Sequence, residues 1–239
     1  MKNVLVLFTS ESDSYIYADI ILQLEKSFSV TFEVISWSRE FKRLEERIER
    51  EDFDFVLAGG GLAAYLPGLC ASLTLKPVFG VPVSTNFGGL DAFLSILQMP
   101  FGNPVGALVP NGVDSVAKLL SFVEKNKVRE ITIVYGADVE NHEFFNVEFN
   151  RLSLYANDLG YILNKSHVID EERVNIVFVH NEYKHSVTSN ALYIPLLTDG
   201  DRNGPTSSLK VLDLAAQGGV WFGVNNSRNA LAFLDKFMG

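Results

Sequence analysis

Short apolar runs alternate with amphipathic stretches along this chain, and the alternation predicts strands separated by helices. Residues 4–8 form a fully apolar run typical of a buried strand, and the apolar residues of 16–24 then recur at helical spacing. Residues 30–34 and 53–58 repeat the strand pattern, with an amphipathic helix expected over 41–48. This order predicts an α/β fold, in which right-handed crossovers place helices on a parallel sheet.

The most distinctive junction follows the third predicted strand. Three consecutive glycines at residues 59–61 separate that strand from a helix-like run. Such a junction exposes backbone N–H groups at a helix N-terminus, where an anion is favoured. Two further apolar strands, at 78–83 and 105–109, also lead into polar or glycine-containing turns. Parallel strands gather these loops at one edge of a sheet, where we expect the functional residues.

The pattern restarts near residue 130. Ile131 follows Val4 by 127 positions and Ile176 follows Phe55 by 121. A constant offset of 115 aligns eight identical pairs: Gly89 and Gly204, Leu94 and Leu209, Leu97 and Leu212, Val105 and Val220, Val109 and Val224, Asn111 and Asn226, Leu119 and Leu234, and Phe122 and Phe237. We therefore predict two tandem copies of one α/β unit, at residues 1–125 and 128–239. Chance similarity is the alternative, because apolar positions recur in every α/β protein.

The second predicted copy lacks the loop chemistry of the first. Its third strand leads into His180, which takes the place of Gly59 at the offset of 121, and no glycines follow. Only eleven residues separate Val179 from Ala191, too few for the helix that follows the glycines in the first copy. We expect the second copy to be a structural partner.

Charge and composition narrow the function classes. A net charge of −9 argues against binding to nucleic acid or an anionic membrane, since both need clustered Lys and Arg. The single cysteine, Cys70, excludes an intrachain disulfide framework, and no apolar run reaches the roughly 18 residues of a membrane span. The four histidines show no metal-ligand spacing. We expect a cytoplasmic protein without a metal or other cofactor.

With these residues in view, the first copy resembles the PurE family, the N5-carboxyaminoimidazole ribonucleotide mutases and aminoimidazole ribonucleotide carboxylases of purine synthesis. Residues 9–13 (T-S-E-S-D) are similar to the family pattern G-S-x-S-D, and residues 36–39 (S-W-S-R) to S-A-H-R. Residues 58–68 are similar to A-G-x-G-x-A-A-H-L-P-G, and 77–83 to P-V-x-G-V-P-V. Residues 95–106 contain S-I-x-Q-M-P and G-x-P-V-G. The resemblance implies a flavodoxin-like three-layer sandwich.

The resemblance also implies a bound ribonucleotide monophosphate. It places the phosphate near Ser10, Ser36 and Arg39, and the ribose hydroxyls near Asp13. The base and its carboxylate would meet the backbone of Gly59, Gly60 and Gly61. The other candidate binding residues are Ser12, Tyr65 and Leu66. From the residues alone, helix capping is the favoured role of Ser10, Ser12 and Asp13, and only the resemblance reverses this. Arg39 is equally typical of a salt-bridged helix.

The departures from the family pattern concern its acid/base chemistry. The family uses the histidine of S-A-H-R for proton transfer, and Ser38 stands at that position. Tyr65 replaces the histidine of A-A-H-L-P-G, so the first copy contains no histidine. A positioned general acid or base is worth about 10²- to 10⁴-fold in rate. The candidate catalytic residues are Ser38 and, from the second copy, His167, which lies near the end of a strand.

Three functions follow as hypotheses. The first is carboxyl transfer on aminoimidazole ribonucleotide, of the mutase or carboxylase type. The second is a non-catalytic nucleotide-binding or scaffold protein. The third is a relative of LarB, a nucleotide carboxylase suggested by the turn at residues 87–90; that family uses a cysteine in the segment matching 98–101, and this chain has none there. PurE proteins assemble as octamers, so four tandem chains would supply an equivalent particle.

Overall fold

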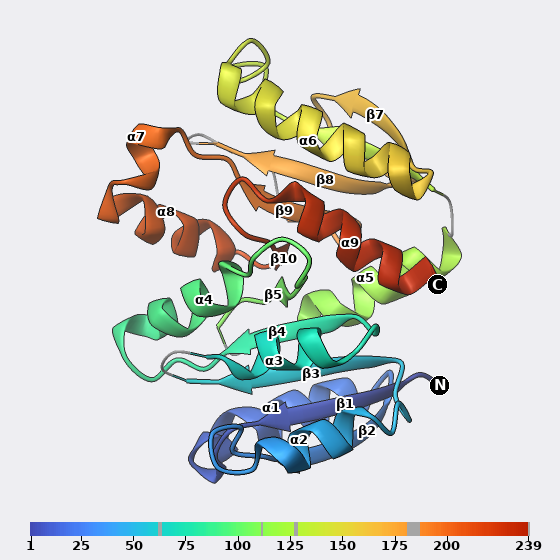
Figure 1. Cartoon of the computed structure of the whole chain (residues 1–239), viewed down its shortest axis with the longest axis vertical. Helices are drawn as coiled ribbons and strands as arrows, with labels where there is room; N and C mark the ends of the chain where they lie inside the picture. The colour runs from blue at the N-terminus through green and yellow to red at the C-terminus, as the bar shows by residue number, and fades with distance from the viewer. Residues whose placement is uncertain (62–63, 111, 127–128, 181–186, 239) are drawn as a thin grey trace.

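The computed structural model of the chain describes residues 1–61, 64–110, 112–126, 129–180 and 187–238. These residues form one mostly parallel sheet with helices on both faces (Figure 1). The predicted flavodoxin-like α/β fold is confirmed. Leu62, Ala63 and Asn111, which the sequence motifs and alignments include, lie outside the described residues, as does His185, one of the four histidines.

The first half of the chain has five strands and five α-helices among its described residues. The strands are β1 (Asn3–Phe8), β2 (Ser29–Val34), β3 (Phe55–Gly60), β4 (Val78–Pro82) and β5 (Gly106–Ala107). The helices are α1 (Ser14–Leu24), α2 (Phe41–Ile48), α3 (Leu66–Leu73), α4 (Leu90–Leu97) and α5 (Asp114–Lys125). Short 3₁₀ turns, η1 (Glu11–Asp13) and η2 (Phe87–Gly89), precede α1 and α4.

The second half has five strands and four helices in the part that the structure describes. The strands are β6 (Glu130–Val134), β7 (Ile162–Ser166), β8 (Val174–Val179), β9 (Ala191–Pro195) and β10 (Val220–Trp221). The helices are α6 (Glu143–Leu159), α7 (Asp199–Arg202), α8 (Pro205–Ala215) and α9 (Ser227–Met238). The boundary between the predicted units falls between α5 and β6.

The strand order among the described residues is β2-β1-β3-β4-β5-β10-β9-β8-β6-β7. Starting from either outer end, each half therefore shows the same sequence of strands. The halves meet where Trp221 of β10 pairs with Ala107 of β5, and this pair is antiparallel while the pairs within each half are parallel. The carboxyl ends of the strands therefore lie at opposite edges of the sheet in the two halves.

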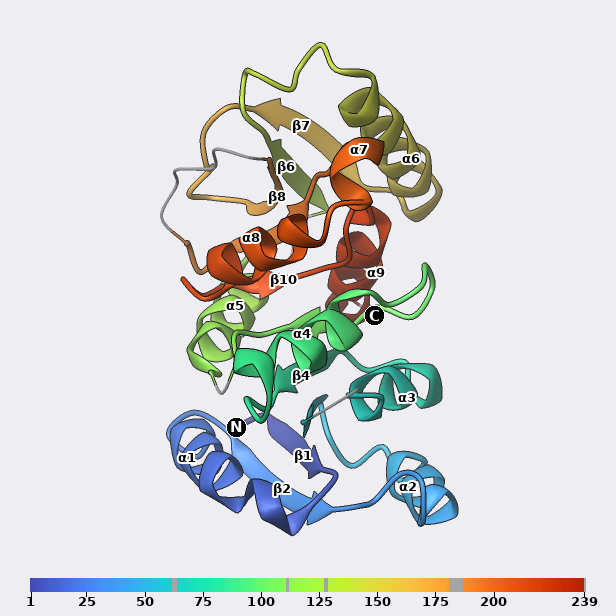
Figure 2. The ribbon, with the colours of Figure 1, turned by 90° about the vertical axis from the view of Figure 1, so that its left-hand side faces the viewer.

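Both halves share their apolar cores. On one face of the sheet, α1, α5, α6 and α9 bury their apolar sides in a single cluster. On the other face, α2, α3, α4 and α8 contribute to a second cluster. Helix α9 reaches across the junction, and Phe233 packs edge-to-face on Phe79 of β4 at 5.1 Å between ring centroids. Figure 2 shows the halves stacked along the long axis, with β10 and α4 near the middle.

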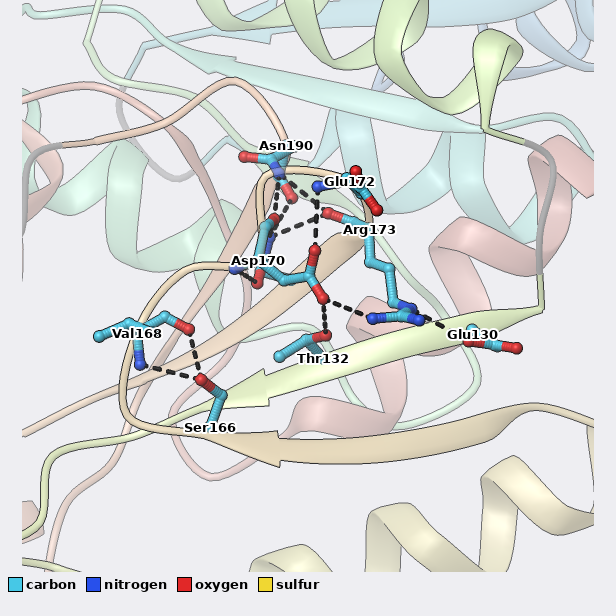
Figure 3. Close-up of polar contacts among 9 residues, drawn as sticks. Glu130, Thr132, Ser166, Val168, Asp170, Glu172, Arg173 and Asn190 are labelled. Carbon is cyan, nitrogen blue, oxygen red and sulfur yellow. Dashed lines mark hydrogen bonds and ion pairs between the residues drawn. The ribbon is translucent and has the colours of Figure 1, made fainter.

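A polar loop lies where the first half has a helix. The connection from β7 to β8 in the second half is a loop whose Asp170 accepts hydrogen bonds from Thr132 Oγ1 (3.2 Å) and Arg173 Nη1 (2.7 Å), as Figure 3 shows. The Nδ2 atoms of the buried Asn175 and Asn190 each donate to the backbone carbonyls of Asp170 and Arg173. These bonds hold the loop on the sheet without a helix.

Two details differ from the sequence-based expectations. Gly59 and Gly60 are the last residues of β3, and only Gly61 lies beyond the strand. In addition, β1 pairs Val4 with Phe55, whereas β6 pairs Ile131 with Val174. The counterpart of Phe55 is thus Val174, not Ile176, and the proposed match of His180 with Gly59 is wrong by two residues. Residues two apart share a face of a strand, so the apolar pattern does not distinguish these alignments.

Candidate functional site

The predicted binding residues gather at the carboxyl edge of β2, β1 and β3. These three strands are neighbours, and Phe8 at the end of β1 lies opposite both Val34 of β2 and Gly59 of β3. The turns that follow the strands therefore begin side by side. This edge brings together the segments that carry Ser10, Ser36 and the three glycines.

The glycines allow close approach of neighbouring strand ends. A Cβ atom on Gly59 would lie 2.4 Å from the ring of Phe8, and one on Gly61 would lie 2.7 Å from Cγ2 of Thr85. Gly60 is less crowded, since the nearest atom, Oγ1 of Thr9, would be 3.4 Å away. Gly59 is therefore required by packing against Phe8. Thr9 and Thr85, which the sequence-based list omits, border the same edge.

The turn after β1 is organised by hydroxyl groups. Ser10 Oγ accepts a hydrogen bond from the Ser12 backbone N–H at 3.2 Å and lies 2.8 Å from Ser12 Oγ. Ser10 thus acts as the cap that the residues alone suggested, in a position that also borders the strand edge. Asp13 is only 5% exposed, and burial raises the pKa of its carboxyl, opposed by the Ser12 hydroxyl. The contact of Asp13 with ribose stays a prediction, since little of the residue reaches solvent here.

The turn after β2 is closed by its own hydrogen bonds. Arg39 Nε donates to Ser36 Oγ at 3.0 Å, and the backbone N–H groups of Arg39 and Glu40 donate to the Ser36 carbonyl. The Ser36 N–H donates in turn to the Glu40 carboxylate at 3.2 Å; hydrogen bonds from Arg43 and from this N–H lower the Glu40 pKa. The turn presents Ser38 and Arg39 as exposed side chains.

Arg39 has unused hydrogen-bonding capacity. Its two terminal nitrogens have no hydrogen-bond or ion-pair partner among the described residues. The ion pairs of α2 instead involve Lys42, Arg43 and Arg47. A guanidinium whose Nε is already anchored is well placed to receive an oxyanion with its free nitrogens.

Tyr65 lies just before α3 and Leu66 is the first residue of that helix, and the two side chains differ in exposure. Tyr65 is 55% exposed, and its ring contacts the half-buried Trp37 edge-to-face, at 5.5 Å and 66°. Leu66 is fully buried in the core, so its side chain is not available to a ligand. The predicted role of Leu66 therefore reduces to its backbone.

The described histidines lie away from Ser38. His142, His167 and His180 follow β6, β7 and β8, at the carboxyl edge of the second half. Strands β2 and β7 are the outermost of the sheet, and Figure 1 shows them at opposite ends of the molecule. Nine strand spacings of about 4.8 Å put them on the order of 40 Å apart along the sheet. One chain therefore does not bring His167 to Ser38.

His167 has local partners of its own. Its Nδ1 lies 3.1 Å from the Tyr135 carbonyl oxygen and its Nε2 lies 3.8 Å from the Glu140 carboxylate. Tyr135 also donates its hydroxyl to Glu140 at 3.1 Å, so the three residues form a closed group. This arrangement fits a structurally hydrogen-bonded histidine, the alternative to a catalytic one.

The described part of the chain offers neither a reactive thiol nor a cluster of metal-binding side chains. Cys70 is buried in α3, and desolvation raises the pKa of its thiol to about 12. Within the described ranges, no three His, Cys, Asp or Glu side chains are grouped to hold a metal ion. Of the helices described, none has both the length and the apolar character needed to span a bilayer.

Comparison with known proteins agrees with this geometry. The family profile described as AIR carboxylase matches residues 3–130, more than half of the chain, and the chain belongs to this family. An N5-carboxyaminoimidazole ribonucleotide mutase of Saccharolobus solfataricus is 37% identical over 137 residues, which cover 55% of this chain and 86% of that protein. A mutase of the same name from Methanocaldococcus jannaschii is 36% identical over 160 residues, covering 59% of this chain and 99% of the relative.

The family match is confined to one part of the sheet. The matched region ends at residue 130, where β6 begins, so nearly all of the second half lies beyond it. The residues that contact one another at the carboxyl edge of β1, β2 and β3 all fall inside the match. The candidate site is therefore a property of the first half.

Proposed function

We propose that the first half binds a ribonucleotide monophosphate at the carboxyl edge of β2, β1 and β3, and that the protein performs carboxyl transfer on aminoimidazole ribonucleotide. Membership of the AIR carboxylase family and the names of the similar mutases support this assignment. The observation that carries it is the closed turn from Ser36 to Arg39, which follows β2 and leaves two guanidinium nitrogens free among the described residues. Strand β1, which leads to Ser10, lies between β2 and the glycine-containing β3.

The phosphate would be held by hydroxyl and guanidinium groups. Ser10 and Ser36 lie on adjacent strand ends, and Arg39 is already oriented by its bond to Ser36. Hydrogen bonds between a guanidinium and a phosphate are roughly twice as strong as neutral ones, and preorganisation lowers the entropic cost of forming them.

A second candidate, a nucleotide-binding protein without catalysis, is favoured by one specific observation. Ser38 is exposed on its turn, and the described histidines lie at the other carboxyl edge. A serine hydroxyl does not titrate near neutral pH, so proton transfer at that position would need a group from another chain.

Calorimetric titration with aminoimidazole ribonucleotide and its carboxylated forms, followed by a turnover assay, tests these proposals. Ser10→Ala combined with Arg39→Ala should abolish binding, because both substitutions remove phosphate ligands. Arg50→Ala is the matched control, since it removes an exposed charge just beyond α2. Unchanged affinity in the double variant would exclude the phosphate site. Binding without turnover would favour the non-catalytic protein, and binding with turnover the enzyme.

We further propose that the two halves are tandem copies of one unit and that four chains associate. The identical strand order of the halves supports the first part. Light scattering tests the assembly. A particle of four chains is expected, and a stable monomer at micromolar concentration would contradict it.

A further inference from the structure

Two aromatic side chains from different turns meet beside the candidate phosphate site. Trp37 lies between Ser36 and Ser38 in the turn after β2, whereas Tyr65 precedes α3. Strand β1 separates the two strands that lead to these turns, so the ring contact spans the end of β1. The two rings thus border the strand end from which Ser10 follows.

Neither ring is fully buried in the apolar core. Trp37 packs one side on the apolar cluster under α2 and α3 but remains half-buried, and Tyr65 is 55% exposed. The Tyr65 hydroxyl has no hydrogen-bond partner among the described residues. By contrast, Trp221 is 1% exposed, stacks on Tyr193 and donates its indole N–H to the Gly218 carbonyl. Trp37 therefore differs from a tryptophan that serves packing alone.

We propose that Trp37 and Tyr65 form a stacking surface that selects ligands carrying a planar heteroaromatic ring. This inference rests on the proposed function, since it places the ring of the ribonucleotide on the aromatic pair while Ser36 and Arg39 hold its phosphate. Trp37 follows Ser36 directly in a turn closed by three backbone and side-chain bonds to Ser36, so the ring and phosphate contacts come from one rigid segment.

The chemistry of the pair defines what it recognises. An indole and a phenol ring offer π faces and edges, and base–aromatic stacking tolerates different rings because every base has a π face. A sugar phosphate without a ring gains nothing from this surface. The expected specificity is for ribonucleotides over ribose phosphates, with selection among ribonucleotides left to other contacts.

The alternative role is mechanical. An edge-to-face pair could brace the turn after β2 against α3 and thereby position Arg39 for any phosphate. In that case removing Trp37 would weaken all phosphate ligands alike. Stacking instead predicts a loss only for ligands that carry a ring, so the two roles are separated by comparing two probes.

The test is a calorimetric comparison of aminoimidazole ribonucleotide with ribose 5-phosphate. Trp37→Ala should weaken the ribonucleotide roughly 5- to 150-fold, the range of one lost base–aromatic stack, and change ribose 5-phosphate less than about 2-fold. Trp37→Phe should keep most of the affinity for the ribonucleotide, because the phenyl ring can still stack. Phe101→Ala is the matched control, an exposed aromatic in the loop between α4 and β5.

Fluorescence of the unmodified protein gives a second measurement that does not depend on a variant folding. The chain has two tryptophans, and only Trp37 is accessible. The ribonucleotide should quench the accessible emission, and saturating ribose 5-phosphate should not. In Trp37→Phe, the remaining emission of Trp221 should stay constant with both probes.

Each outcome supports or overturns the stacking role of Trp37 and Tyr65. Equal weakening of both probes in Trp37→Ala, or no weakening of either, overturns the stacking role while the phosphate site stands. Absence of quenching by a bound ribonucleotide does the same. If neither probe binds the unmodified protein, both the proposed function and this inference fail. Both the phosphate site and the stacking role are supported if Trp37→Ala weakens only the ribonucleotide and Arg39→Ala weakens both probes.

Discussion

At the residue scale, the glycines of β3 have unequal roles although the sequence presents them as one motif. A Cβ atom on Gly59 would collide with the fully buried ring of Phe8, whereas one on Gly60 would only reach a normal contact distance from Thr9. The difference follows from the alternation of strand faces. Gly59 is thus a packing residue, Gly61 is crowded by Thr85, and Gly60 is the glycine of the three with the most room.

We expect Gly59→Ala to lower the free energy of unfolding by about 1 to 3 kcal/mol, the usual cost of overpacking a core. Gly60→Ala, the matched control one residue away, should change stability by less than about 1 kcal/mol, since its neighbour is farther. Chemical denaturation of both variants measures the difference. Equal effects would show that the contact with Phe8 does not govern this position.

At the element scale, the loop between α4 and β5 is tied to the second half. Asn229 in α9 is 1% exposed, and its Nδ2 donates to the carbonyls of Met99 (3.2 Å) and Pro100 (3.0 Å). Its Oδ1 accepts from the Gly102 N–H at 3.1 Å. Asn226 donates to the Met99 carbonyl as well. The Q-M-P motif of the first half is therefore held by the helix that ends the second.

Asn229→Ala should destabilise the protein by about 1 to 3 kcal/mol, because it removes three hydrogen bonds made by a side chain that is only 1% exposed. Asn203→Ala removes an exposed amide that bonds only the Asp199 carbonyl, and it should cost less than about 0.5 kcal/mol. Thermal unfolding of the two variants gives the comparison. A stability near that of the unmodified protein for Asn229→Ala would mean that the loop finds water or other partners.

The elements themselves were largely predictable from sequence. The apolar runs predict the positions of β1 to β5. Because the strands of a parallel sheet are buried on both faces, such continuous apolar runs, separated by amphipathic helices, also predict that the sheet is parallel. The second alignment was wrong by two residues, since the pattern repeats every two. Likewise the pattern carries no information on which side chains touch across turns, so the Trp37–Tyr65 contact was not foreseen.

The candidate site was predictable only in part. The motifs pointed to strand ends that are neighbours in the structure, since the segments with Ser10, Ser36 and the glycines follow paired strands at one edge. They gave no basis for excluding the Leu66 side chain, whose burial depends on the position of α3, or for separating His167 from Ser38. That separation follows from the strand order, in which the halves join through one antiparallel residue pair of the two-residue strands β5 and β10; such a short long-range pairing leaves little trace in the sequence.

At the scale of the whole molecule, one lysine links the halves. Lys236 in α9 donates from Nζ to the Thr74 carbonyl, beyond α3, at 3.1 Å. Desolvation at this contact lowers its pKa to about 8. The charged form is therefore disfavoured in the folded protein relative to the unfolded chain.

We expect stability to rise with pH around this group. Between pH 8 and 10 the unfolded chain keeps the Lys236 proton while the folded protein has lost it, so the unfolding free energy should increase relative to Lys236→Met. The increase should be at most about 1.4 kcal/mol per pH unit. Urea unfolding of both proteins at several pH values measures this difference. A constant or falling difference would contradict a depressed lysine pKa.

The reversed direction of the strands across β5 and β10 has an evolutionary consequence. Substitutions accumulating in the turns after β6, β7 and β8 do not touch the turns of the candidate site, because the sheet separates the two edges. Selection on ligand recognition and selection on the second edge can therefore proceed independently within one folded chain. Among the described residues, the second half has a polar loop between β7 and β8 where the first half has a helix between β2 and β3, and such insulation permits a difference of this kind.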